Sequence, residues 1–503
     1  MSPIDPATIT PGRRALITFT IMLATIVYAV DTTIAVVALP HMQGSMSATT
    51  DQIAWVLTSY IVASAIMTPP TGFLAARLGR RRLFATMVGG FTLTSMLCGA
   101  ATSLEQIVLF RILQGAFGAG LIPLSQAVLL DINPRERHGQ AIAMWGLGVM
   151  VGPIIGPTLG GYLTEYFSWR WVFYVNLPVG ALALAGILAF VPETDRIRRR
   201  FDWFGFALLS LAIGSLQMML DRGESQDWFS SPEIVLEAVM AGLCLYLFLV
   251  HMFTADEPFI EPALFRDRNF AAGLVFMTVI GMVLFSSLTL LPTFLQNVLG
   301  YPVLDAGFIL APRGFGTGLA MFLVGRLLAR FDARWFIFIG LALTAASLWE
   351  MSQFTVDVTM QRFILVSIAQ GFGLGFVFVP LSTIAFSTMD PRLRSEGTAM
   401  FSLLRNIGSS IGISLVVSLL AQNMQRAHAG LAGIMSPFRD TMNAPFLPQT
   451  WNWHLPTGVM ALNGEIAKQA VMVAYLNDFL MLVVLSLIPM VLLPLMRGTR
   501  ASA

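Results

Sequence analysis

The sequence predicts an all-α polytopic membrane protein that crosses the bilayer fourteen times. Of its 503 residues, 56% are hydrophobic and only 12% are charged, and the mean hydropathy is +0.74. Soluble domains carry about 25% charged residues, so this chain lacks the charge needed to cover a water-exposed surface. Apolar runs of about 20 residues, the length of a membrane-spanning helix, recur along the whole sequence. The short alternating segments typical of transmembrane β-barrels do not occur in it.

The charge of the segments between the apolar runs supports the count of fourteen. Arginine accumulates on every second inter-span segment, as expected for cytoplasmic loops when both termini lie inside. A missed or invented span would disturb this alternation. The predicted spans are 15–39, 51–76, 83–102, 105–130, 140–164, 171–191, 203–221, 233–254, 270–298, 303–325, 335–355, 361–388, 397–421 and 471–496.

The spans group as six plus two plus six, and the two outer groups share an internal repeat. The segment QGAFGAGLIPLSQAVLLDINPRERHGQAIAM (114–144) is similar to QGFGLGFVFVPLSTIAFSTMDPRLRSEGTAM (370–400). Repeats of this kind are typical of transporters that bind substrate between two pseudo-symmetric halves. The predicted parts are a first half at 1–195, two inserted spans at 196–260, and a second half at 261–503 with a long outer loop at 422–470.

Several ionisable residues lie inside predicted spans, where a charge is costly and therefore indicates function. Asp31 lies within TIVYAVDTTIAVVALP (25–40), and Arg111 lies in span four. Because burial disfavours a charged carboxylate, Asp31 is the first candidate for binding a coupling proton, with Arg111 as a partner in coupling. Asp478 in the last span is the second carboxylate candidate, and a position at the outer membrane interface is an equally good interpretation of it. A structural hydrogen bond for Asp31 and a structural tether for Arg111 are the alternatives.

A promiscuous binding cavity needs adaptable aromatic and polar side chains. The candidates for lining it are Tyr28, Trp55, Tyr60, Gln114, Arg313 and Arg405. For the two arginines of the second half, bracing between helices is an equally good interpretation.

Two segments resemble signature motifs of the major facilitator superfamily. GFLAARLGRRRLF (72–84), with Gly72, Gly79 and Arg80, is similar to the superfamily's loop signature between spans two and three. IVLFRILQGAFGAG (107–120) is similar to its buried-arginine motif. The resemblance implies two six-helix halves and a gate at the first of these loops. Ala76 stands where the superfamily has an acidic residue, which departs from its charge-relay gate.

Span five contains GVMVGPIIGPTLGG (148–161), which resembles the antiporter motif found in exporters of the same superfamily. Small residues at this spacing give a smooth helix face, kinked at proline, against which another helix can rock. The residues of this face are Gly148, Gly152, Pro153, Gly156, Pro157, Gly160 and Gly161.

Three further segments narrow the resemblance to the fourteen-span drug:proton antiporters and their EmrB-type multidrug exporters. They are VDTTIAVVALP (30–40), SWRWVFYVNLPVG (168–180) and GSLQMMLDRGESQDWFSS (214–231). Val36 departs from the family, which usually has asparagine there. The resemblance implies proton-coupled efflux of lipophilic toxic compounds across the cell inner membrane by alternating access. It also implies cytoplasmic termini, a periplasmic adaptor and an outer-membrane channel as partners, and docking at 422–470.

Other classes of function fit the sequence less well. The nearest alternative is a dedicated exporter of one metabolite, such as a siderophore or a fatty acid. An ATP-driven pump is excluded because the sequence has no GxxxxGK[ST] loop. A membrane enzyme would need clustered histidines, cysteines or carboxylates, and the sequence shows no such cluster. A channel would need a ring of pore-lining residues, and the sequence shows no such ring. No cofactor, metal or nucleic acid is expected, and the proton is the expected coupling ion.

Overall fold

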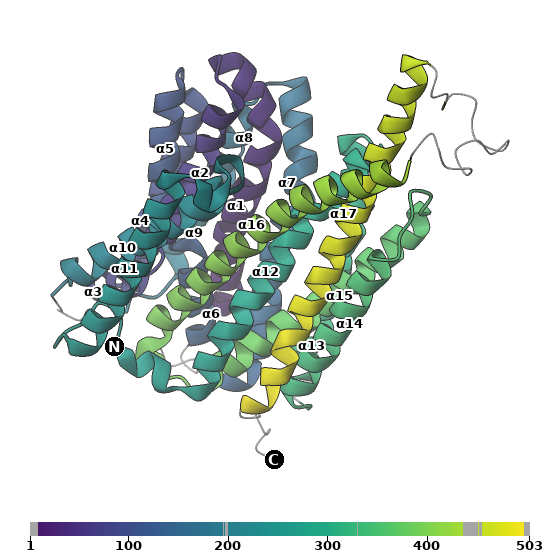
Figure 1. Ribbon diagram of the computed structural model, residues 1–503. Helices are drawn as coiled ribbons and strands as arrows, with labels where there is room; N and C mark the ends of the chain where they lie inside the picture. Colours follow the sequence, from purple (N-terminus) through teal and green to yellow (C-terminus); the bar gives the residue numbers. More distant parts are fainter. Residues whose placement is uncertain are drawn as a thin grey trace.

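The computed structural model describes residues 9–194, 196, 200–328, 330–435, 451 and 455–496. Figure 1 shows two helical bundles side by side, one formed by the early helices and the other by the late ones. Within the described residues, 13 helices are long and apolar enough to cross a membrane, or 14 when a bent pair is counted as one span. The predicted all-α, multi-pass fold class is therefore confirmed.

The first bundle contains three predicted spans that the structure divides into two helices each. The span predicted at 51–76 bends by 57° between its two helices. Pro69 and Pro70 lie at the bend, where a proline removes a backbone hydrogen bond and clashes with the preceding turn. The helices are α1 (Pro11–Met46), α2 (Thr50–Met67), α3 (Pro70–Leu78), α4 (Arg80–Ala100), α5 (Leu104–Gly118), α6 (Leu121–Ile132), α7 (His138–Tyr166), α8 (Trp171–Tyr174) and α9 (Asn176–Phe190).

The two inserted spans form a helical hairpin, and the second bundle follows them. The hairpin helices are α10 (Trp203–Arg222) and α11 (Pro232–Thr254), and their connection contains the short 3-10 turns η3 (Glu224–Gln226) and η4 (Trp228–Ser230). The second bundle consists of α12 (Arg268–Asn297), α13 (Val303–Leu327), α14 (Ala333–Met351), α15 (Met360–Ser387), α16 (Arg394–Ile434) and α17 (Pro456–Leu492).

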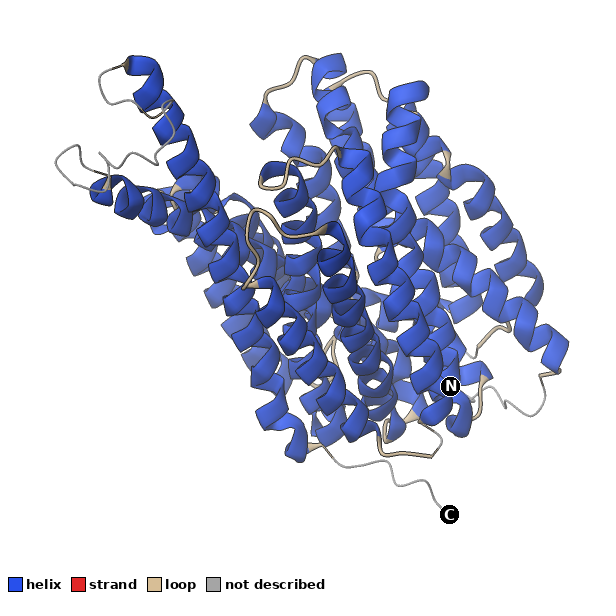
Figure 2. Cartoon of the chain, turned by 90° about the vertical axis from the view of Figure 1, so that its right-hand side faces the viewer, coloured by secondary structure: helices blue, strands red, loops and turns tan. Residues whose placement is uncertain are grey.

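Helix replaces much of the long loop expected at 422–470. Helix α16 continues to Ile434 and α17 begins at Pro456, while residues 436–450 and 452–454 lie outside the described part. Figure 2 shows the two helices projecting beyond the bundle. Leu462 and Ile466 are buried there against Leu431 of α16. This apolar packing stabilises helix where the polar composition had predicted a loop.

The molecule has two end faces, one at each end of its long helices. Helix α1 begins and α17 ends at the same end, which is called the terminal face (Figure 1). The end from which α16 and α17 project is called the opposite face (Figure 2).

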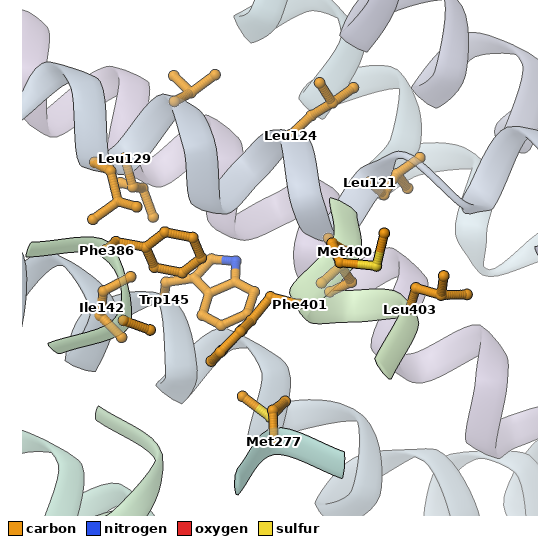
Figure 3. Packing of buried hydrophobic residues seen from close by; sticks show 14 of the residues in the cluster. Leu121, Leu124, Leu129, Ile142, Trp145, Met277, Phe386, Met400, Phe401 and Leu403 are labelled. Carbon is orange, nitrogen blue, oxygen red and sulfur yellow. The ribbon is translucent and has the colours of Figure 1, made fainter. Parts of the chain in front are cut away.

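The two bundles share an apolar core toward the terminal face. Figure 3 shows Trp145 of α7 packed beside Phe386 of α15 and Phe401 of α16. The Trp145 indole is 1% exposed and donates its N–H to the Ser125 hydroxyl at 2.8 Å. Apolar side chains from both halves therefore close the interface at this end.

Candidate functional site

Asp31 lies inside the first bundle at the centre of a buried hydrogen-bond network. The side chain of Asp31 is 0% exposed. Its Oδ2 accepts from Arg111 Nη1 at 2.9 Å, and its Oδ1 accepts from Gln114 Nε2 at 2.8 Å and Asn176 Nδ2 at 2.7 Å. Helix α5 supplies Arg111 and Gln114, and α9 supplies Asn176. The structure thus brings two proton-coupling candidates, Asp31 and Arg111, into one ion pair.

Arg111 has partners besides the carboxylate. Its Nε donates to the Val56 carbonyl at 3.0 Å, and its Nη1 also donates to Gln114 Oε1 at 2.8 Å. The Tyr60 ring lies beneath the guanidinium, with 4.0 Å from Cζ to the ring centroid, which is a favourable cation–π geometry. The guanidinium therefore keeps several interactions that do not depend on Asp31.

Asn176 is a member of the network that sequence reasoning did not single out. Its Nδ2 also lies 3.0 Å from the Ser95 hydroxyl oxygen, and that hydroxyl donates to the Phe173 carbonyl at 2.9 Å. Asn176 lies in SWRWVFYVNLPVG, where an amide within an apolar span is the signal that identifies it. A buried amide must find a partner, so it indicates a polar contact inside the bundle.

The two oxygens of the Asp31 carboxylate have different partners. Two amide donors occupy Oδ1 and the Arg111 guanidinium occupies Oδ2, so a proton at Oδ2 would replace the bond from Arg111. Arg111 then keeps the Val56 carbonyl, the Gln114 amide oxygen and the Tyr60 ring. A proton at Oδ2 would leave the buried Arg111 charge without its counter-ion, so the stability of this pair opposes protonation and sets how readily the proton is bound.

The six cavity candidates do not gather in one place. Tyr60 and Gln114 belong to the Asp31 network, and Tyr28 is partly buried on α1, the helix of Asp31. Trp55 instead lines an open groove of about 330 Å³ between α2 and α5, near the opposite face. Its neighbours there are mostly apolar, with Leu109 of α5 among them.

Arg313, Arg405 and Asp478 lie in the second bundle, and Arg405 lies within electrostatic range of Tyr28 on α1. Arg313 Nη2 donates to the Ser287 hydroxyl at 2.7 Å, and the Arg405 backbone packs against Gly281 of α12. Neither arginine forms an ion pair within the described part of the chain. Asp478 is 0% exposed, and the Asn423 amide of α16 faces its carboxylate.

A second buried carboxylate joins the two halves at the terminal face. Asp131 of α6 pairs with Arg80 of α4 and accepts from Arg394 Nη1 of α16 at 2.7 Å. Arg80 Nε also donates to the Ser395 hydroxyl at 2.9 Å. Of these four residues only Arg80 was predicted from sequence. Asp131 directly follows the span predicted at 105–130, in a segment that resembles a loop in sequence.

Gly72 lies at the closest approach between the halves at this face. A Cβ at Gly72 would lie 2.7 Å from the Cα of Glu396, so any larger residue would push α3 away from α16. Gly79 forms the turn between α3 and α4 with φ of +89°, a conformation that favours glycine. The loop motif thus shapes the contact between the halves, although Ala76 cannot supply a charge.

The glycine face of α7 packs on α1, the helix that carries Asp31. A Cβ at Gly152 would overlap the Ala29 carbonyl, and one at Gly160 would lie 2.9 Å from Ile34 Cγ1. Gly148 and Gly156 face α1 in the same way, Pro157 and Gly161 also lie in α7, and the Pro153 side chain lies outside the described part. The helix that this motif contacts is therefore α1.

Comparison with known families decides the classification. The model of the Major Facilitator Superfamily matches residues 21–413. The chain belongs to the Major Facilitator Superfamily. Within that superfamily it is 34% identical to the probable multidrug resistance protein EmrY of Escherichia coli, over 93% of this chain and 92% of that protein. It is 35% identical to the multidrug export protein EmrB of E. coli, over 86% of each chain.

Other relatives agree with this placement. The fatty acid resistance protein FarB of Neisseria gonorrhoeae is 36% identical over 85% of each chain. Among solved structures, the human organic anion transporter MFSD10 (TETRAN) matches 95% of this chain and 100% of that chain, with a TM-score of 0.61 and 14% identity. A bacterial homologue of the human lysosomal transporter Spinster matches 96% of each chain, with a TM-score of 0.52 and 18% identity. The structures show the transporter fold, and the relatives confirm the predicted EmrB-type group of multi-pass membrane transporters.

Proposed function

We propose that this protein exports lipophilic toxic compounds across the cell inner membrane in exchange for protons, by alternating access. The observation that carries the proposal is the buried Asp31 carboxylate, whose partners allow a proton to bind at Oδ2. The names of its relatives, multidrug export and resistance proteins, support the direction and the broad substrate class.

Each step of the proposed cycle uses groups of this chain. Protonation of Asp31 at Oδ2 releases Arg111, which turns to its remaining partners near Tyr60 of α2. Because the glycine face of α7 packs on α1, this change on α1 is passed to α7, and α7 contacts α13 of the other half. Loss of the proton restores the pair and returns the halves to their first arrangement.

The proposed orientation places the terminal face in the cytoplasm, in accordance with its arginine-rich loops. In this arrangement the Asp131 contacts with Arg80 and Arg394 close the cytoplasmic side. The opposite face, with its projecting helices α16 and α17, would then lie in the periplasm.

A periplasmic adaptor and an outer-membrane channel are the proposed partners. The projecting part of α16 and α17 supports an adaptor site because it exposes apolar side chains in water, including Met460 at 74% and Leu455 at 54%. Replacing both with aspartate is expected to abolish adaptor co-purification and to leave transport by the purified protein intact. Unchanged adaptor binding by this variant would contradict the site.

The direct test of the proposed function is transport by the purified protein in proteoliposomes under an imposed pH gradient. Uphill movement of a dye or an uncoupler that stops when the gradient is collapsed is the expected result. Uphill transport that is unchanged when the pH gradient is collapsed would contradict proton coupling.

A dedicated exporter of one metabolite, such as a fatty acid, is the second candidate, and the similarity to FarB favours it. The same vesicles distinguish the two functions. Transport of several unrelated lipophilic compounds supports multidrug export, whereas transport of fatty acid alone supports the second candidate.

A further inference from the structure

The two halves meet along two edges that are built differently. Along one edge α7 packs directly on α13 from one face to the other. At the terminal face a Cβ at Gly139 would lie 3.0 Å from Leu328, and at the opposite face one at Gly307 would lie 3.4 Å from the Thr158 hydroxyl. Helices of the two bundles therefore close this edge by themselves.

The second edge lies between α2–α3 of the first bundle and α16 of the second. At the terminal face α3 contacts α16 directly, through Gly72 and Glu396. Toward the opposite face the inserted helix α10 packs against both α2 and α16. Helix α11 packs on α10. The insert therefore covers the part of this edge nearest the opposite face.

The insert is fastened to the first bundle by two polar contacts with α2. The Thr58 hydroxyl donates to the Asp221 carboxylate at the end of α10. The next residue, Arg222, lies over the Trp55 ring at 5.9 Å from Cζ to the centroid, and its Nη2 donates to Glu233 of α11 at 3.2 Å. These contacts hold the end of α10 against α2.

One side chain adds a hydrogen bond between the insert and the second bundle. Trp228, in η4, donates its indole N–H to the hydroxyl of Ser418 on α16 at 2.9 Å and also lies 3.3 Å from Glu224 Oε2. Ser418 is 6% exposed and Trp228 is partly buried. This link crosses from the insert to the opposite half of the transporter.

The backbone holds Trp228 in this orientation at some cost. Asp227 and Trp228 have φ of +53° and +52°, a left-handed conformation that is uncommon for a large side chain. The indole folds back on Gly223, where a Cβ would lie 2.7 Å from ring atom Cε3. Conformations of this kind persist where the surrounding structure requires them, and they are concentrated at functional positions.

We propose that the inserted hairpin is a lateral seal, and that Trp228 is the positioning residue that holds it against α16. The inference rests on the proposed export of lipophilic compounds. Such a compound partitions from an open edge back into the bilayer, because each buried methylene favours lipid. With the α2–α16 edge covered, the compound leaves along the axis of the molecule into water at the opposite face.

The test compares delivery into water with pumping in proteoliposomes. The probe is a lipophilic fluorescent dye, trapped by albumin in the receiving compartment, and pumping is followed as dye-driven proton flux. Trp228→Ala removes both the ring and the donor, while Trp228→Phe keeps a ring beside Gly223 and removes only the donor. Trp203→Ala, at the other end of α10 and 72% exposed, is the matched control.

If the hairpin is a lateral seal, the amount of dye delivered into water per proton transported should fall roughly threefold to tenfold in Trp228→Ala. This is the factor by which the loss of one hydrogen bond changes an equilibrium constant. Trp228→Phe should fall in the same direction, and Trp203→Ala should match the wild type. A wild-type ratio in both Trp228 variants, or an equal fall in Trp203→Ala, would overturn the seal. Absence of dye-driven proton flux in the wild type would instead overturn the proposed function on which the seal rests.

Discussion

Asp31 and Asp131 are both buried carboxylates paired with arginine, but their partners come from different parts of the molecule. Asp31 takes its three donors from α5 and α9, within the first bundle. The Asp131 carboxylate forms ion pairs with both Arg80 of the first bundle and Arg394 of the second. Movement of one half against the other therefore leaves the Asp31 network intact and breaks the Asp131 network.

This difference indicates two uses of the same chemistry. A carboxylate whose partners all lie in one bundle can bind a proton in any relative position of the two halves. A carboxylate shared across the interface responds to the position of the halves instead. Substitutions at the partners of Asp31 should therefore affect stability and proton response, whereas substitutions at the partners of Asp131 should affect the contact between the halves.

Replacing Arg111 with leucine should have the largest effect, because it leaves the Asp31 charge buried without its ion-pair partner. Removing one member of a buried pair costs about 3–5 kcal/mol. Thermal unfolding in detergent should show this loss of stability, together with loss of transport. A variant as stable as the wild type would mean that the ion pair contributes nothing to the fold.

Asn176→Ala should have a smaller effect, because Asp31 keeps Arg111 and Gln114. A hydrogen bond to a charged group contributes about 1.5–3 kcal/mol. We expect an altered pH dependence of transport, measured in vesicles across a range of external pH, with a moderate loss of stability. An unchanged pH profile would remove Asn176 from the proton-binding network.

Arg394→Leu should leave the first bundle intact and open the terminal face. The lost interaction crosses the halves, so the population of conformers open at this face should rise, detectable as a longer spin-label distance between α4 and α16. Arg392→Leu, two residues before the start of α16 and exposed, is the matched control. Equal distances in both variants would show that Arg394 does not hold this face closed.

Gly72→Ala tests the same face by sterics alone. A methyl group would lie 2.7 Å from the Glu396 backbone, and overpacking of this kind costs about 1–3 kcal/mol. The same shift in spin-label distance is expected, at smaller amplitude. Gly44→Ala, where the added methyl meets no atom within 4 Å, should have no effect. A wild-type distance in Gly72→Ala would mean that the helices relax around the methyl.

The sequence predicts the membrane helices and the ionisable members of the site, but not how the site is assembled. Asp31 and Arg111 are conspicuous because a charge in an apolar run is costly. Asn176 carries a weaker signal, a single amide in an apolar span, and Ser95 is a small polar residue that such spans tolerate, so the contact of these two residues with each other appears only when the helices are placed. Arg394 reads as one loop arginine among many until α16 brings it to Asp131.

Two features of the fold could not be predicted from the amino-acid composition of their segments. Glycine and proline are common in membrane helices, so the prolines at Pro69–Pro70 did not indicate the 57° bend between α2 and α3. The outer parts of α16 and α17 are polar in sequence, and their helix depends on the contact of Leu462 and Ile466 with Leu431. Such tertiary contacts override local composition.

The most direct test of the central claim is uphill transport by Asp31→Asn under an imposed pH gradient in proteoliposomes. Asparagine keeps the shape of the side chain and cannot bind and release the proton. The account predicts that the wild type accumulates a lipophilic dye against its gradient, that Asp31→Asn only equilibrates it or stalls, and that Asp478→Asn still accumulates it. Proton-driven accumulation by Asp31→Asn equal to that of the wild type would contradict the account, and loss of it in Asp478→Asn alone would transfer coupling to the second bundle.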